Sequence, residues 1–282
     1  MTVQRLNARF AELKRQGRAG FVAYIMAGDP DAEASLAVLQ GLPAAGADII
    51  ELGFPFSDPM ADGPAIQRGA LRALAKGMTL AGTLALASRF RDGDEATPVV
   101  LMGYMNPILS YGLEKFAADA AKAGVDGVIV VDCPPEEADP VLAAFDPAGL
   151  ALIRLATPTT DDARLPTVVK GTNGFVYYVS VAGVTGGKSV DADAIAPAVQ
   201  RVRAASGLPV AVGFGIRTPE QAAAVARIAD AAVVGSALVD AVADALAQNR
   251  DPVAKVLETA DGLAKSVRSA RAPGATTRLG AD

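Results

Sequence analysis

The sequence predicts a single (β/α)8 barrel, also called a TIM barrel. Eight short apolar runs recur along its 282 residues, and segments of helical composition separate most of them. Such alternation implies parallel strands joined by right-handed crossovers. Eight units of roughly 30 residues also fit the usual barrel of about 250 residues. A doubly wound sheet is the alternative, but it does not require so regular a series.

The predicted strands are residues 21–26, 48–52, 99–102, 127–131, 151–155, 175–179, 209–213 and 231–235. Among the intervening segments, residues 31–45, 65–75, 112–123, 136–145 and 219–228 have helical composition. Residues 2–16 and about 252–270 are two further helical segments, predicted to cover faces of the barrel. We therefore expect one barrel domain over residues 1–270. Residues 271–282 mix Pro, Gly and polar residues and are expected to be a disordered tail.

Composition excludes several classes of protein. Hydrophobic residues make up 51% and charged residues 20%, enough for a large core. The net charge of −5 argues against general nucleic-acid binding. No apolar run is long enough for a membrane-spanning helix, and the N-terminus lacks the apolar centre of a signal peptide. Since Cys133 is the only cysteine, no intrachain disulfide is possible, and we expect a cytoplasmic protein.

The chain contains no histidine. This absence removes Ser-His and Cys-His catalysis and the usual zinc sites. Any acid–base work therefore falls to Asp, Glu, Tyr or Lys, and no metal is expected.

Two carboxylates flank the Gly/Pro-rich loop after the second predicted strand. Glu51 lies at the strand's C-terminal tip, where a buried lone carboxylate is costly. It indicates either chemistry at this edge of the sheet or a bond to N–H groups of the next loop. Asp62 precedes Gly63-Pro64 and a helical stretch, a spacing that by itself favours a helix N-cap over catalysis.

Side-chain alternation predicts which residues surround Glu51. If Glu51 faces the interior of the barrel, Tyr24 and Tyr177 are plausible neighbours at the same rim. The alternative is that both tyrosines only pack in the core, the ordinary role of such aromatics.

Glycines end the last two predicted strands, at Gly213-Phe-Gly215 and at Gly235-Ser236. Loops after strands seven and eight of such barrels often hold a phosphate, using backbone N–H groups and a helix N-terminus. Tight turns alone are the alternative. Two such turns on consecutive strands favour phosphate binding.

Residues 182–189 nearly spell a nucleotide-binding P-loop. The leading glycine of that motif is replaced by Ala182, however, and a poor helix start follows. A mobile Gly-rich lid over the barrel mouth, with Thr185 reaching inward, is the better interpretation.

Motifs across nearly the whole chain resemble the tryptophan synthase alpha chain family. They are Gly28-Asp-Pro30, residues 51–64, Tyr104-Met-Asn-Pro107, residues 180–186, Gly213-Phe-Gly215 and Gly235-Ser236. The run 51–64 is highly specific. Two positions depart from the family: Tyr24 replaces a common phenylalanine, and Val181 lies where some members carry an arginine.

The resemblance implies a (β/α)8 fold and cleavage of indole-3-glycerol phosphate to indole and glyceraldehyde 3-phosphate. It makes Glu51 the general acid–base and Asp62 the group that stabilises the indolenine, with Tyr177 ordering the site. The implied substrate-binding residues are Tyr24, Met102, Thr185, Gly186, Gly215, Gly235 and Ser236. The acid must be available near neutral pH, whereas a free glutamate titrates around 4.3. A desolvated barrel mouth would raise its pKa.

The resemblance also implies a partner, the tryptophan synthase beta chain, in an alpha2-beta2 heterotetramer. The expected contact residues are Pro55, Phe56, Asp58, Asn106 and Pro107. No cofactor is expected on this chain, and pyridoxal phosphate is expected on the beta chain. Two alternatives stay open: a stand-alone indole-3-glycerol-phosphate lyase, and a non-catalytic barrel that binds a phosphorylated ligand.

Overall fold

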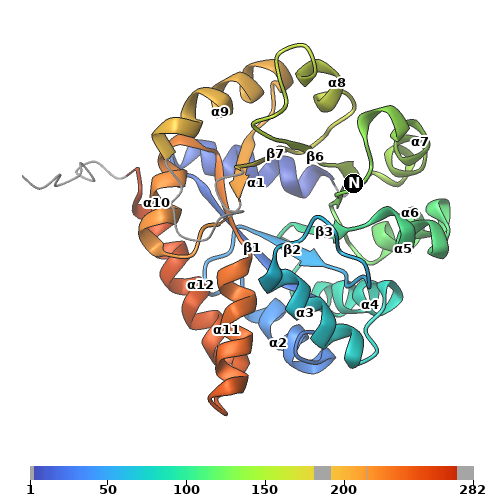
Figure 1. Ribbon diagram of the computed structural model, residues 1–282, viewed down its shortest axis with the longest axis vertical. Coiled ribbons are helices and arrows are strands. Elements are labelled where there is room, and N and C mark those ends of the chain that lie inside the picture. Colours follow the sequence, from blue (N-terminus) through green and yellow to red (C-terminus); the bar gives the residue numbers. More distant parts are fainter. Residues whose placement is uncertain (1–2, 181–191, 214, 272–282) are drawn as a thin grey trace, which may run out of the picture.

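The strands form a parallel barrel surrounded by helices (Figure 1). The computed structural model describes residues 3–180, 192–213 and 215–271. Within these residues the sheet has the order β5-β4-β3-β2-β1-β9-β8-β7-β6, and all the pairings are parallel. The strands are β1 (Gly20–Met26), β2 (Ile49–Gly53), β3 (Val99–Gly103), β4 (Gly127–Val130), β5 (Ala151–Leu152), β6 (Arg154–Ala156), β7 (Val176–Val179), β8 (Val210–Gly213) and β9 (Ala231–Val234). The predicted fold class is confirmed.

The fifth predicted strand is divided into β5 and β6. β5 pairs with β4, and β6 pairs with β7, so the two ends of the strand order meet at Ile153. The backbone N–H of Arg154 donates to the hydroxyl oxygen of Thr172 at 3.1 Å instead of to a neighbouring strand. A side chain therefore interrupts the ladder, and the two short strands occupy one position of an eight-position barrel.

Helices follow most strands and cover the outside of the sheet (Figure 1). They are α1 (Val3–Arg15), α2 (Ala32–Gly41), α3 (Pro64–Ala75), α4 (Leu80–Arg91), α5 (Met105–Tyr111), α6 (Leu113–Lys122), the 3₁₀ turn η1 (Pro135–Glu137), α7 (Asp139–Ala148), α8 (Leu165–Val169), α9 (Ala192–Ser206), α10 (Pro219–Ile228), α11 (Ser236–Ala247) and α12 (Pro252–Ser269). The helical segments expected from composition begin or end within a few residues of these bounds.

Both terminal helices pack on the barrel as expected. Leu6, Phe10 and Leu13 of α1 belong to the apolar cluster inside the barrel, and the Phe10 ring lies 5.6 Å from that of Phe175. Since this cluster also contains Ile49 and Val22, α1 closes the end at which the strands begin. Helix α12 packs against α2, α10 and α11 on the outside.

Acidic residues secure the beginnings of several strands. Asp48, Asp126 and Asp230 each accept a backbone N–H from the start of a neighbouring strand, at 2.8–2.9 Å. Each is also paired with arginine: Asp48 with Arg18, Asp126 with Arg5 and Arg91, and Asp230 with Arg203. At this end of the barrel, carboxylates serve the fold.

Among the described helices, none is long and apolar enough to cross a membrane. The assignment of residues 1–270 to one domain stays a prediction. The predicted tail, residues 271–282, lies almost wholly outside the described residues.

Candidate active site

Glu51 is buried at the C-terminal end of β2. Its side chain shares a face with Ile49, which belongs to the interior cluster, whereas Ile50 and Leu52 belong to the outer one. The residue is 2% exposed, and its Oε1 has no hydrogen-bond partner among the described residues. Burial, and secondarily the charge of Asp62, raises the pKa of Glu51 to about 8. The alternative of a carboxylate bonded to loop N–H groups therefore fails for Oε1.

Asp62 is not the N-cap of α3, so the interpretation favoured by spacing is wrong. Gly63 occupies the cap position and no side-chain bond caps the helix. The Asp62 side chain instead receives a hydrogen bond from Tyr104, which partly offsets the effect of burial, and its pKa is raised to about 6. Since it does not cap the helix, the Asp62 carboxyl group can act near Glu51.

Tyr104 was not predicted to act in the site, although it stands in a quoted motif. It follows β3, is buried, and its hydroxyl oxygen accepts the backbone N–H of Ala61 at 3.0 Å. It therefore contacts both Asp62 and the residue before it. A polar residue just after a strand's C-terminal end was the available signal, the same one that identified Glu51.

Tyr24 and Tyr177 are neighbours of Glu51, as alternation predicted. The charge of Glu51 contributes to a raised pKa for both buried hydroxyls, after burial itself. A β-carbon at Gly53 would lie 2.2 Å from the Tyr24 hydroxyl, and one at Gly213 would lie 2.1 Å from the Tyr177 hydroxyl. Glycine on the adjoining strand thus makes room for each tyrosine.

The two glycine turns lie after β8 and β9, which are neighbouring strands. Gly215 has φ of +76°, a backbone conformation that favours glycine. Gly235 directly precedes α11, whose first residue is Ser236. A β-carbon at Gly235 would lie 3.2 Å from Tyr24 Cδ1, so this turn also borders the tyrosine beside Glu51. Met102, on β3, is half-buried and pairs in register with Gly53.

The loop between β2 and α3 places side chains on the surface beside α5. Pro55 is buried, Asp58 is exposed, and the Phe56 ring lies 5.4 Å from the ring of Tyr104. Met60 is 81% exposed. Figure 1 shows α5, which carries Asn106 and Pro107. The backbone N–H of Met105, the first residue of α5, donates to Asp132 Oδ1 at 2.7 Å.

Other predictions fall outside what the structure describes. Thr185, Gly186 and the whole lid segment belong to the residues that are not described. Among the described residues, no group of three or more Cys, Asp or Glu side chains could hold a metal ion.

The arrangement combines two carboxyl groups of different character. With a pKa of about 8, Glu51 retains a proton at neutral pH, whereas Asp62, with a pKa of about 6, is mostly ionised. A buried acid, a nearby anion and two buried tyrosine hydroxyls can together donate a proton to a substrate and stabilise positive charge on it.

Comparison with known proteins gives one consistent result. The family model for the tryptophan synthase alpha chain matches residues 10–268. The tryptophan synthase alpha chain of Phenylobacterium zucineum is 70% identical, and the alignment covers 96% of this chain and 98% of the relative. That of Caulobacter vibrioides strain NA1000 is 69% identical with the same coverage.

Solved structures agree with the sequence comparison. Tryptophan synthase subunit alpha from Legionella pneumophila superposes with a TM-score of 0.87 at 40% identity, covering 93% of this chain and 98% of that one. A chain of Mycobacterium tuberculosis tryptophan synthase gives a TM-score of 0.84 at 39% identity, covering 94% and 98%. The chain described here belongs to the tryptophan synthase alpha chain family.

Proposed function

We propose that Glu51 is the general acid–base and Asp62 the charge-stabilising group of the lyase reaction that defines this family. The chain is an indole-3-glycerol-phosphate lyase, which releases indole and glyceraldehyde 3-phosphate. The observation that carries the assignment of Glu51 is its burial with Oε1 unpartnered and a pKa of about 8.

The chemistry requires such an acid. Indole is a poor leaving group as a carbanion, so C3 must gain a proton before the carbon–carbon bond to the glycerol chain breaks. Glu51 gives its proton to C3 and becomes a carboxylate. It then assists removal of the proton from the glycerol hydroxyl as the aldehyde forms, which returns it to the acid form. Acid–base catalysis of this kind contributes roughly 10²–10⁴ in rate.

Asp62 has the opposite task. Once C3 is protonated, the ring carries positive charge as an indolenine, and an ionised carboxylate bonded to the ring N–H stabilises it. The hydrogen bond from Tyr104 favours the ionised form of Asp62, against the effect of burial. We assign Tyr104 the role of supporting that charge.

The remaining side chains bind the substrate. Tyr24 and Met102 line the indole pocket, and Tyr177 orders the substrate near the bond that breaks. The N-terminus of α11, with Gly215, Gly235 and Ser236, supplies donors for the phosphate. Thr185 and Gly186 remain predicted contributors from the lid.

The expected partner is a tryptophan synthase beta chain, in an alpha2-beta2 heterotetramer within the cytoplasm. Pyridoxal phosphate belongs to the beta chain of this enzyme and not to the alpha chain. Exposed Met60 and Asp58 and half-buried Phe56 lie on the loop that leads to Asp62. Docking of a partner on this loop, with Asn106 and Pro107 beside it, would couple assembly to catalysis.

The test measures cleavage of indole-3-glycerol phosphate by the wild type, Glu51→Gln and Asp62→Asn. Both variants should bind substrate and lose at least about 100-fold in kcat. A Glu51→Gln rate above about a tenth of wild type would overturn its assigned role.

The partner is tested separately by adding a beta chain. It should raise the rate, and Asp58→Ala should diminish that rise while basal turnover stays within about twofold of wild type. A bound beta chain that leaves the rate unchanged would favour a stand-alone lyase. Absence of any turnover would favour the non-catalytic barrel.

A further inference from the structure

Helix α3 packs closely against the turn after β1 and against α11. Gly69 and Arg72 lie one turn apart on the same face of α3. A β-carbon at Gly69 would lie 2.8 Å from Val239 Cγ1 and 3.0 Å from Asp29 Oδ2. The helix therefore approaches both elements as near as a residue without a side chain permits.

An ion pair with two parallel hydrogen bonds fixes the position of α3. Arg72 Nε donates to Asp29 Oδ1 and Arg72 Nη2 to Asp29 Oδ2, both at 2.7 Å. Arg72 Nη2 also lies 3.4 Å from the carbonyl oxygen of Val239. The Asp29 side chain is 2% exposed and that of Arg72 is 24% exposed, so solvent screens the pair weakly.

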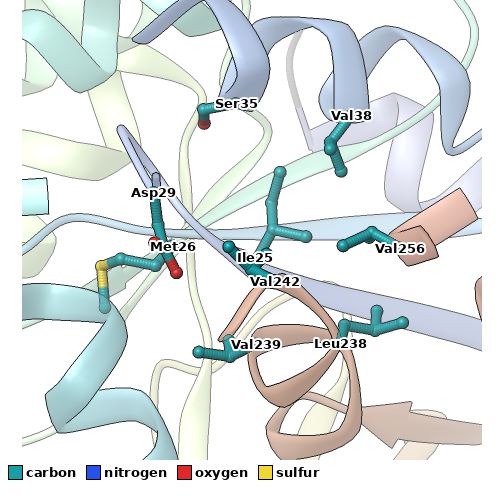
Figure 2. Close-up of a pocket in the computed structure, with 9 residues that line it drawn as sticks. All are labelled: Ile25, Met26, Asp29, Ser35, Val38, Leu238, Val239, Val242 and Val256. Carbon is teal, nitrogen blue, oxygen red and sulfur yellow. The ribbon is translucent and has the colours of Figure 1, made fainter. Parts of the chain in front are cut away.

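A cavity of about 10 Å³, room for about one water molecule, lies beside Asp29. Figure 2 shows Asp29, Met26 and Val239 on one side of it and Ser35 from α2 on another. The position of α3 at this point thus depends on the Arg72–Asp29 contact and on the close packing at Gly69.

Helix α3 in turn holds the backbone of Asp62. Gln67 Nε2 donates to the carbonyl oxygen of Asp62 at 2.9 Å, and the Gln67 N–H donates to the carbonyl oxygen of Gly63 at 3.0 Å. Asp62 itself stands two residues before the helix begins at Pro64. A shift of α3 is therefore transmitted to Asp62 through one hydrogen bond and two residues of backbone.

We propose that Arg72 is a positioning residue for Asp62: by locking α3 to Asp29, it fixes where the Asp62 carboxylate lies in the site. This inference rests on the proposed role of Asp62. Arg72 contacts Asp29 and α11 and is not assigned any contact with the substrate.

The test variant is Arg72→Lys, which keeps the charge but cannot form two parallel hydrogen bonds to one carboxylate. Misplacement of a catalytic group by about 1 Å can cost about 100-fold in rate, so we expect kcat to fall about 10-fold. KM for indole-3-glycerol phosphate should change less than about twofold, because the phosphate-binding turns are intact. Asp29→Asn breaks the same contact from the other side and should have the same effect.

The chain offers a matched control at the opposite end of the barrel. Arg18 donates to both oxygens of Asp48, at 2.8 and 2.7 Å, with side chains 18% and 2% exposed. Arg18→Lys should lower the midpoint of thermal unfolding as Arg72→Lys does, but leave kcat unchanged. Equal kcat for Arg72→Lys and Arg18→Lys would overturn the proposal, since the Asp29 pair would then serve stability alone.

A double-mutant cycle separates this proposal from the proposed function. In the Asp62→Asn background, measured by single turnover, Arg72→Lys should cost less than about twofold, because its effect passes through Asp62. A further 10-fold loss there would overturn the positioning role while the proposed function stands. A normal rate for Asp62→Asn alone would overturn both.

Discussion

Glu51→Gln should make the protein more stable at neutral pH while it abolishes the lyase activity. The pKa of Glu51 is raised from 4.5 to about 8, so between these values the folded chain holds a proton that the unfolded chain releases. Stability is therefore full below pH 4.5 and falls as the pH rises towards 8, by about 1.4 kcal/mol per pH unit. Because glutamine does not ionise, the variant should escape this loss, which amounts to about 3 kcal/mol between pH 5 and pH 7.5.

The assay is urea unfolding of both proteins at pH 5 and at pH 7.5, from which the free energies of unfolding are compared. The difference between variant and wild type should grow by about 3 kcal/mol towards the higher pH. Glu33→Gln is the control, since the pKa of exposed Glu33 is lowered by its contact with Arg89 and no such gain should follow. If Glu51→Gln and wild type lose or gain stability in parallel, Glu51 is ionised in the folded protein and cannot be the acid.

Three further outcomes are expected. The pH profile of kcat/KM should be bell-shaped, rising near pH 6 as Asp62 ionises and falling near pH 8 as Glu51 loses its proton; a flat profile between pH 5 and 9 would contradict both assignments. Tyr104→Phe should lower kcat about 10-fold and move the acidic limb to higher pH, because the hydrogen bond that lowers the pKa of Asp62 is lost. Gly215→Ala, strained at φ of +76°, should raise KM for the phosphorylated substrate but hardly affect cleavage of a dephosphorylated analogue; equal losses would mean that the turn serves only the backbone.

The barrel itself could be predicted because each of its strands leaves a local signal. Seven of the eight predicted apolar runs begin and end within one residue of an observed strand. The division of the fifth predicted strand could not be foreseen, since it depends on the Thr172 hydroxyl, which reaches the backbone of Arg154 only in the folded chain. A local pattern does not record such a distant contact.

The candidate active site also depends on contacts between residues far apart in the sequence, which a local pattern does not record. Glu51 could be recognised from the sequence because a buried carboxylate at the end of an apolar strand is costly. Asp62 was ambiguous, since spacing before Gly63-Pro64 suits a cap as well as a catalytic group. Tyr104 was missed as a functional residue because its contact with Asp62 joins loops after two different strands. Sequence therefore indicates which residues are unusual, whereas the fold determines which of them meet.

Glu51 differs from the other buried acids Asp29, Asp48 and Asp126, each of which is paired with arginine, and this contrast supports its assignment. Where the strands begin, Asp48 and Asp126 are nearly inaccessible, yet each is neutralised by arginine and by a backbone N–H. Where they end, Glu51 is equally buried, no cation among the described residues pairs with it, and Asp62 adds a second negative charge. Leaving a buried carboxylic acid without a cation costs stability as soon as it ionises. The chain thus pairs its structural and positioning carboxylates with arginine, and keeps Glu51 protonated where a proton has to be delivered.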